Sequence, residues 1–190
     1  MTKKYKLTER YIIERLGVKL FQIQALVAFG TVVAGELGGY IQSEECLSHY
    51  GNAWVYGNAL VYGNARVYGD AWVYDNARVH DNALMYGNAR VYGDARVYGD
   101  AQVYGDALVC GDARVFKRNA IFWASVVGAE NGTLTVTSGK NGLVVTRGCF
   151  TGTKEEFLSA SAAKHNEKIQ REYRLLIEVA ESRIEQHKAP

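Results

Sequence analysis

The residues of this sequence best suited to chemistry are arginines, each followed two positions later by an aromatic ring or a histidine. Four such pairs are spaced by multiples of twelve residues: Arg66 with Tyr68, Arg78 with His80, Arg90 with Tyr92, and Arg114 with Phe116. Residues two apart lie on the same side of a strand. Guanidinium groups pair with carboxylates and phosphates, and aromatic rings anchor protein partners or stack on bases. The pattern has two readings: stacked rings with arginines over them that only stabilise the sheet and keep its surface soluble, or a binding surface. As a binding surface it predicts a protein partner, with a nucleotide or nucleic acid as the alternative.

These pairs belong to a repeat that fills residues 51–116 with eleven hexapeptides of the form Gly-Asn/Asp-Ala-x-Val-Tyr. The third position is always Ala, and the fifth is Val except at Met85. So strict a period is typical of a solenoid, whose units are stabilised by stacking on their neighbours. Arginines at x cannot line an interior. We therefore expect Ala and Val inside, x and Tyr outside, and the Gly-Asn or Gly-Asp pairs at the corners.

The repeat resembles the hexapeptide-repeat proteins, which form left-handed parallel β-helices. Their pattern places a small residue four positions after an aliphatic one, as Val55 and Ala59 do here. The left-handed sense is implied by the resemblance alone. Residues 21–59 are also similar to the opening of uncharacterised bacterial and phage proteins, through the run VVAGELGGYI and the step LSHYG before the repeats. Some of those relatives carry an acyltransferase label that rests on analogy of fold.

The number of hexapeptides in one turn decides which x residues lie together. Three per turn would stack residues 18 apart and mix arginines with apolar residues. Two per turn would stack residues 12 apart and give one basic column and one apolar column. The basic column would hold Trp54, Arg66, Arg78, Arg90, Gln102 and Arg114, and the apolar column Leu60, Trp72, Leu84, Arg96 and Leu108. We therefore predict a flattened roll of 12-residue turns in preference to a three-sided prism.

The apolar column predicts a covered face, because a solvated face would carry more polar residues. Its members, with the tyrosines beside them, are Leu60, Tyr62, Trp72, Tyr74, Leu84, Tyr86 and Leu108. The C-terminal helices or a second copy of the chain would cover them, and a recruitment site for a different protein is the alternative. Closed symmetric dimers are the commonest oligomers, so we expect a homodimer.

The flanks of the repeat differ from it, and we divide the chain into a β cap (1–50), the solenoid (51–128) and a C-terminal segment (129–190). That last segment predicts a hairpin from 133–137 and 143–146, a capping box that opens a helix at Thr153, a break near His165 and a second helix from Glu167. The run GCFTGTKEEF resembles C-terminal segments of phage hypothetical proteins, which implies a phage or prophage origin.

Composition narrows the remaining possibilities. The repeat carries five Arg and seven Asp, a net charge of −2, which disfavours long nucleic acids. Three cysteines at unrelated spacings predict no disulfide framework and a cytoplasmic location. The apolar stretch 21–35 is too short to cross a membrane and contains two glutamines. No metal-ligand spacing or phosphate-loop motif is present, so we expect no metal and no cofactor.

Four histidines, at positions 49, 80, 165 and 187, are the candidates for catalysis. The resemblance to hexapeptide acyltransferases implies a histidine base beside acyl-CoA, and only His80 lies in the repeat. We prefer a non-enzymatic phage or prophage scaffold that binds a host macromolecule, and interference with a bacterial defence system would fit that origin. The alternatives are an acyltransferase that uses His80 and a binder of a nucleotide or nucleic acid.

Overall fold

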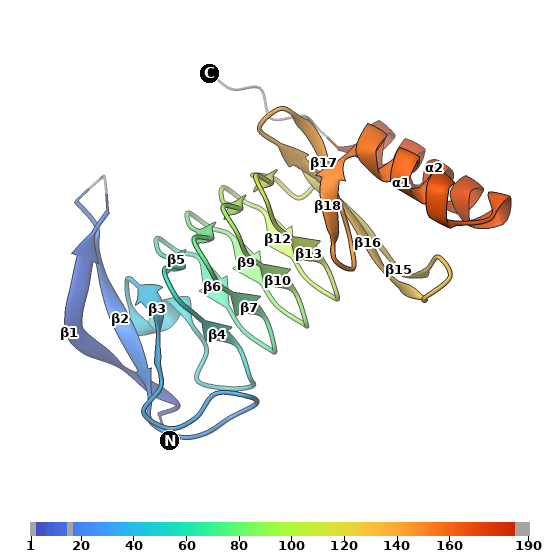
Figure 1. The fold of residues 1–190 in the computed structure, drawn as a ribbon. Coiled ribbons are helices and arrows are strands. Elements are labelled where there is room, and N and C mark those ends of the chain that lie inside the picture. The colour runs from blue at the N-terminus through green and yellow to red at the C-terminus, as the bar shows by residue number, and fades with distance from the viewer. Residues whose placement is uncertain (1–2, 15–16, 185–190) are drawn as a thin grey trace.

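The computed structural model describes residues 3–14 and 17–184. Figure 1 shows an elongated molecule with three successive parts: a hairpin cap, a stack of regular turns, and a small sheet with two helices. The predicted mostly-β fold, a parallel β-solenoid between a cap and a C-terminal hairpin with helices, is therefore confirmed.

Each hexapeptide contributes one two-residue strand, made of its x residue and the Val or Met after it. These strands form three parallel sheets, which we name after their first strands. The β4 face contains β4 (Trp54–Val55), β7 (Trp72–Val73), β10 (Arg90–Val91) and β13 (Leu108–Val109). The β5 face contains β5 (Leu60–Val61), β8 (Arg78–Val79), β11 (Arg96–Val97) and β14 (Arg114–Val115). The β6 face contains β6 (Arg66–Val67), β9 (Leu84–Met85) and β12 (Gln102–Val103).

The predicted 12-residue winding is wrong, because one turn contains three hexapeptides. Trp54 pairs with Trp72, 18 residues later, and Leu60 pairs with Arg78 in the same parallel register. The corners explain this. Four residues separate one strand from the next, and the middle two, Gly or Asp followed by Asn or Asp, form the turn. A tight two-residue reversal would place the strands side by side as a hairpin and not in sheets that face each other ~10 Å apart. A three-sided turn needs only a moderate bend at each corner.

The predicted inside and outside of the repeat are confirmed. The Ala and the Val or Met of every hexapeptide are at most 1% exposed. At two corners an aspartate replaces the usual glycine: Asp75 and Asp81 have φ of 59° and 58°. Their Oδ2 atoms accept hydrogen bonds from the next turn, at 3.2 Å from Gly93 N–H and 3.1 Å from Gly99 N–H. These bonds offset the cost of left-handed backbone in a residue with a side chain.

Backbone hydrogen bonds between the turns have one direction. The N–H of one turn donates to the C=O of the next, as from Trp54 to Ala71 and from Leu60 to Ala77. The carbonyl groups of the first turn therefore point toward the N-terminal end, where the stack itself has no donor for them. The N-terminal cap has to supply donors there, because buried carbonyl groups without a partner destabilise a fold.

The cap does so on all three faces. On the β5 face, β3 (Leu37–Ile41) donates through Tyr40 N–H, and on the β6 face Ser48 N–H donates to Val67 O. On the β4 face the buried ammonium of Lys4 donates to Ala53 O at 2.8 Å. The antiparallel strands β1 (Tyr5–Ile13) and β2 (Lys19–Ala25) then continue the sheet beyond β3. At its N-terminal end, the parallel stack is therefore closed by the β1–β2 hairpin.

The C-terminal part is an antiparallel sheet of β15 (Ile121–Val127), β16 (Gly132–Gly139), β17 (Gly142–Arg147) and β18 (Phe150–Thr153). The helices α1 (Lys154–Lys164) and α2 (Glu167–Arg183) pack against it. The predicted hairpin, the capping box at Thr153 and the start of α2 are confirmed.

The predicted solenoid boundary at 128 is wrong, because β15 pairs with β16 and belongs to this second sheet. The sheet meets the last turns of the stack. Leu108 N–H donates to Thr135 Oγ1 at 3.0 Å, and Ala113 forms a bridge with Gly139. The C-terminal end of the stack exposes N–H groups, so the sheet supplies an acceptor there.

Because the interior is narrow, we expect substitutions that enlarge a buried side chain to destabilise the fold strongly. Ala65→Leu forces three extra carbon atoms into a buried position, and we expect it to lower the free energy of unfolding by ~1–3 kcal/mol or more. Arg66→Leu, at the next residue of the chain, alters a side chain that points outward and should change the free energy of unfolding by less than ~0.5 kcal/mol. Urea unfolding of both variants checks this, and equal effects would contradict the assigned interior.

Candidate functional site

The three-sided winding distributes the predicted Arg/aromatic surface over all three faces. Arg66 and Tyr68 lie on the β6 face, Arg90 and Tyr92 on the β4 face, and Arg78, His80 and Arg114 on the β5 face. The prediction that these residues share one face is therefore wrong. The error arose because the face was predicted by stacking residues 12 apart, whereas residues 18 apart stack in the structure.

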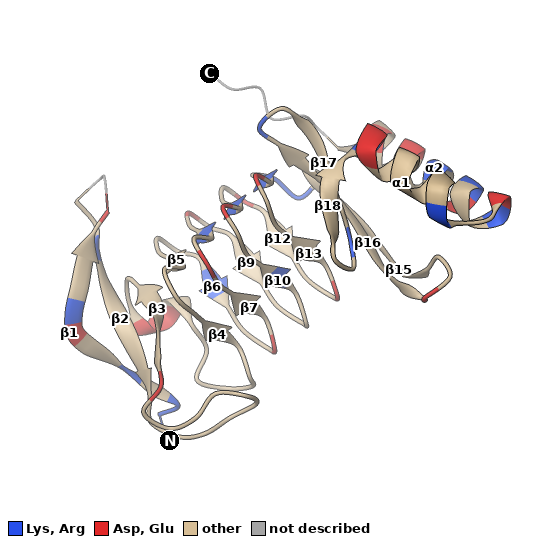
Figure 2. Cartoon of the chain, in the orientation of Figure 1, with Lys and Arg blue, Asp and Glu red and all other residues tan. Residues whose placement is uncertain are grey.

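The β5 face nevertheless carries an arginine row, which we define as Arg78, Arg96 and Arg114. Arg96 pairs with Arg78 on one side and with Arg114 on the other, in parallel register. The spacing between neighbouring strands is ~4.8 Å. Figure 2 shows basic positions along the upper edge of the stack, on the row of strands that follows β5. Sequence reasoning placed Arg96 in the apolar column and missed this row, although an 18-residue spacing predicts it.

An aromatic row, Tyr62, His80, Tyr98 and Phe116, runs beside the arginine row. The rings of Tyr62 and His80 stack with centroids 4.9 Å apart, and those of His80 and Tyr98 stack at 5.2 Å. Burial raises the pKa of the Tyr62 and Tyr98 hydroxyls, and nearby arginines oppose that shift. The two rows place planar cations beside stacked rings on one flat sheet.

Two contacts hold members of these rows in place. Arg78 forms an ion pair with Glu14, which follows β1 in the cap and has a side chain that is 10% exposed. His80 Nδ1 lies 3.1 Å from Asp81 Oδ1 at the adjacent corner. Burial alone would raise the pKa of Asp81, but hydrogen bonds from His80 and from Gly99 N–H outweigh it and lower that pKa. The more exposed guanidinium of Arg96 lies in the middle of the row.

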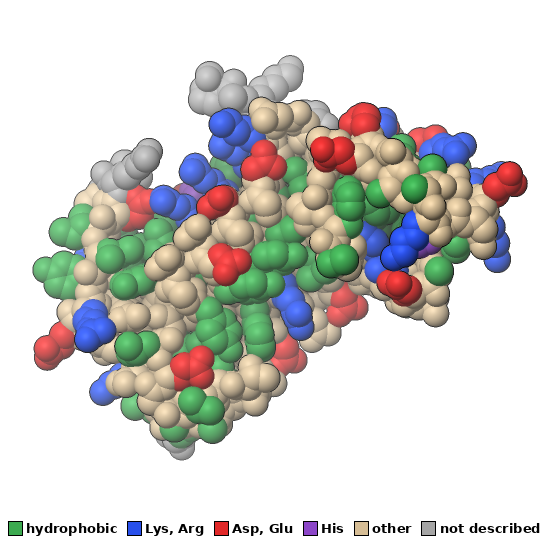
Figure 3. All heavy atoms as spheres, viewed as in Figure 1, with side chains coloured by type: hydrophobic (Ala, Val, Ile, Leu, Met, Phe, Trp, Pro, Cys, Tyr) green, Lys and Arg blue, Asp and Glu red, His purple; other side chains and the backbone are tan. Residues whose placement is uncertain are grey.

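The predicted apolar face is also divided by the winding. Leu60 and Tyr62 lie on the β5 face, and Leu84 and Tyr86 lie on the β6 face. The β4 face keeps the other three: Trp72, Tyr74 and Leu108. Figure 3 shows apolar side chains gathered over β4, β7 and β10, with acidic side chains at the edges. The predicted covering by the C-terminal helices is wrong, because those helices pack on the β15–β18 sheet.

The three described histidines lie in different parts of the fold. His49 stacks on Tyr5 in the cap, and His165 ends α1. His80 is sandwiched between two tyrosines in the aromatic row. His187 lies outside the described residues. Within residues 3–14 and 17–184, no group of three or more His, Cys, Asp or Glu side chains is arranged to hold a metal ion.

Comparison with known families agrees with this architecture. The sequence profile described as the YdcK beta solenoid repeat matches residues 53–69, 59–75, 85–105 and 101–115. The chain is a β-solenoid repeat protein. The matched segments lie within the eleven hexapeptides, so the likeness extends to the repeat and leaves the cap and the C-terminal part uncovered. No curated protein sequence gives a significant match. No helix in the described part of the chain is long and apolar enough to span a membrane.

The raised tyrosine pKa values predict a dependence of stability on alkaline pH. In the unfolded chain these hydroxyls lose their protons near pH 10, whereas the folded chain retains them. The free energy of unfolding should therefore fall as the pH rises above about 10. Urea unfolding at pH 8 and above pH 10 measures it. Tyr98→Phe removes one contribution and should show a shallower fall, since all other titrating groups are shared. An equal or steeper fall in Tyr98→Phe would contradict this assignment.

Proposed function

We propose that the protein is a non-enzymatic binding scaffold whose β5 face engages an acidic segment of a partner protein. The observation that carries this proposal is the arginine row: three guanidinium groups on successive turns, beside a row of stacked rings. Arginine and tyrosine are the side chains that most often dominate binding energy at protein interfaces. A rigid sheet presents them without the entropy cost of ordering a loop.

The surroundings of the arginine row favour a protein partner over a nucleic acid. Asp94 and Asp112 lie at the corners before β11 and β14, and Asp81 and Asp100 at the corners after β8 and β11. Carboxylates on both sides repel a long phosphate backbone. A peptide that presents two carboxylates fits between them, because one carboxylate can pair with Arg96 and the other with Arg114, while Arg78 is paired with Glu14.

The proposal includes a phage or prophage origin, a host protein as the partner and action in the host cytoplasm. The support for the origin is the sequence resemblance of the cap and of residues 148–157 to phage proteins. The support for the location is three free thiols at Cys46, Cys110 and Cys149. A role against a bacterial defence system is one form that such binding would take.

Charge reversal within the arginine row tests the proposal. A short fluorescently labelled peptide with two glutamates serves as the acidic probe, and anisotropy measures its binding to the full chain. We expect Arg96→Glu to weaken binding by about tenfold or more, because it removes one cation and repels the probe. The matched control is Arg66→Glu, which is exposed at the same hexapeptide position on the β6 face and should change affinity by less than about twofold.

Three outcomes would contradict the proposal. Equal losses in the two variants would show that net charge, and not the β5 face, governs binding. Tighter binding of a single-stranded oligodeoxynucleotide of equal charge would favour a nucleic-acid ligand. Turnover of acetyl-CoA that disappears in His80→Ala would establish the acyltransferase alternative, for which the contact between His80 and Asp81 is the favouring observation.

We also propose that the chain forms a homodimer through the β4 face. Trp72, Tyr74 and Tyr92 remain half-buried there in the isolated chain, and the Arg90 guanidinium lies 5.5 Å from the centre of the Trp72 ring. Two such faces related by a two-fold axis would cover each other's apolar residues.

Oligomeric state checks this second proposal. Light scattering at micromolar concentration should give a dimer for the natural chain and a monomer for Trp72→Glu, because a buried unpaired carboxylate is costly at an interface. The control is Leu84→Glu, at the equivalent position of the β6 face, which should remain a dimer. A monomeric natural chain, or loss of the dimer in Leu84→Glu alone, would overturn the assignment to the β4 face.

A further inference from the structure

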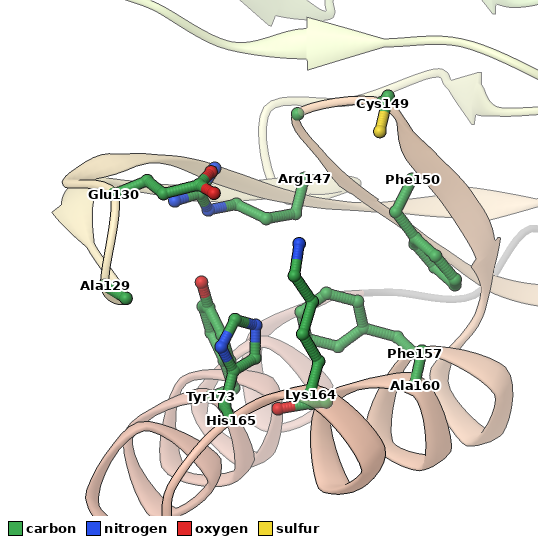
Figure 4. Close-up of a pocket in the computed structure, with 12 residues that line it drawn as sticks. Ala129, Glu130, Arg147, Cys149, Phe150, Phe157, Ala160, Lys164, His165 and Tyr173 are labelled. Carbon is green, nitrogen blue, oxygen red and sulfur yellow. The ribbon is translucent and has the colours of Figure 1, made fainter.

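A pocket of about 320 Å³ lies between the C-terminal sheet and the two helices. Its upper wall comes from the turn after β15, the end of β17 and the turn before β18, and its lower wall comes from α1 and Tyr173 of α2. Figure 4 shows Arg147, Lys164, His165 and Tyr173 around one space, with Phe150 and Phe157 at one side of it. The volume is at the lower end of the range for small-molecule sites.

Two residues that line this pocket each have a buried polar atom with no hydrogen-bond partner among residues 3–14 and 17–184. One is Nε of Arg147, whose side chain is 11% exposed, and the other is Oγ of Ser161, a residue that is 4% exposed. Buried polar groups are almost always hydrogen-bonded, since leaving one without a partner costs ~1–3 kcal/mol. Both atoms can donate a hydrogen bond, and both residues line the same pocket.

The pocket is also basic. Arg147 uses Nη2 to donate to Val127 O at 3.1 Å, and its Nη1 lies 4.0 Å from a carboxylate oxygen of Glu130. Glu130 is 72% exposed in its side chain, so water screens this contact. Lys164 places a second cation at the pocket, and Figure 4 shows its ammonium group extended into the space below Arg147. Glu130 is the single carboxylate among the described lining residues.

Three aromatic rings form another part of the wall. The rings of Phe150 and Phe157 meet edge to face at 5.3 Å, and those of Phe157 and Tyr173 at 5.1 Å. A ligand that fits this wall has an apolar or aromatic body. A ligand that fits the donors has oxygen atoms with negative charge.

We propose that this pocket binds a small organic oxyanion, a phosphate or carboxylate group on an aromatic body. The oxyanion accepts hydrogen bonds from Arg147 and Ser161 and pairs with Lys164, while the body packs against Phe150, Phe157 and Tyr173. The site is separate from the arginine row of the β5 face, so its test does not depend on the acidic-peptide proposal.

Calorimetric titration of the full chain with phenyl phosphate tests the site, with benzoate, inorganic phosphate and phenol as further probes. We expect phenyl phosphate or benzoate to bind at millimolar concentration or below, inorganic phosphate more weakly, and phenol not at all. Tighter binding of phenyl phosphate than of benzoate would identify a phosphate ligand, and the reverse order would identify a carboxylate ligand. Binding of phenol equal to that of both anions, or of inorganic phosphate equal to that of phenyl phosphate, would overturn the proposed ligand class.

A lysine variant locates the binding. Lys164→Gln, on the surface of α1, should weaken binding of the better anion by about tenfold, because a charge-assisted contact is lost. Lys168→Gln, an exposed lysine of α2 outside the pocket lining, should change it by less than about twofold. Equal effects of the two substitutions would overturn the site.

Cys149 supplies an independent readout. Its thiol is exposed and lines the pocket, whereas Cys46 and Cys110 are buried. The better anion should slow alkylation of Cys149 by iodoacetamide in the natural chain, and should do so less in Lys164→Gln. Alkylation at an unchanged rate under saturating anion would place any binding elsewhere and would also overturn the site.

Discussion

The structure depends on a ladder of backbone hydrogen bonds that joins each turn of the repeat to the next. Because every two-residue strand is too short to be stable by itself, the ladder and the buried Ala/Val interior stabilise the stack together. The ladder has a direction, with donors toward the C-terminal end and acceptors toward the N-terminal end. The two ends therefore have opposite requirements. The cap supplies donors, which are backbone N–H groups and the Lys4 ammonium, and the C-terminal sheet supplies an acceptor, the Thr135 hydroxyl oxygen.

The same stacking organises side chains outside the core into rows. At the corners, Asn64 donates its amide to Asn82, and Asn82 donates to Asp100, which has only acceptors and ends the series. On the faces, aromatic rings stack at the strand spacing, as Tyr86 does on Tyr104 at 4.9 Å. A row of arginines is tolerated on the β5 face because carboxylates at the corners and Glu14 in the cap compensate its charge. Rows of like groups are thus a consequence of winding, and the surface chemistry follows from it.

Much of this could be read from the sequence. The period predicts a solenoid, Ala and Val predict the interior, and the Thr153 capping box predicts the first helix. The alternation of inside and outside is the same for two or three hexapeptides per turn, so it could not decide the winding. We chose between the two windings by asking which one separates basic from apolar columns, and this criterion was wrong. The three-sided stack places arginines on all three faces. The length of the Gly-Asn corner was the informative signal. The C-terminal pocket was beyond sequence reasoning, because Arg147 and Lys164 come from segments without a repeat and meet only through tertiary packing.

The three-sided turn also fixes how the two ends of the molecule face one another. Each hexapeptide forms one side of the triangle, so inserting or removing a single unit rotates everything that follows by a third of a circuit about the long axis. Units gained or lost in threes change only the length. The number of hexapeptides, eleven here, therefore sets the angular phase between the N-terminal hairpin and the C-terminal helices. Homologues of different length that keep this phase would differ by multiples of 18 residues.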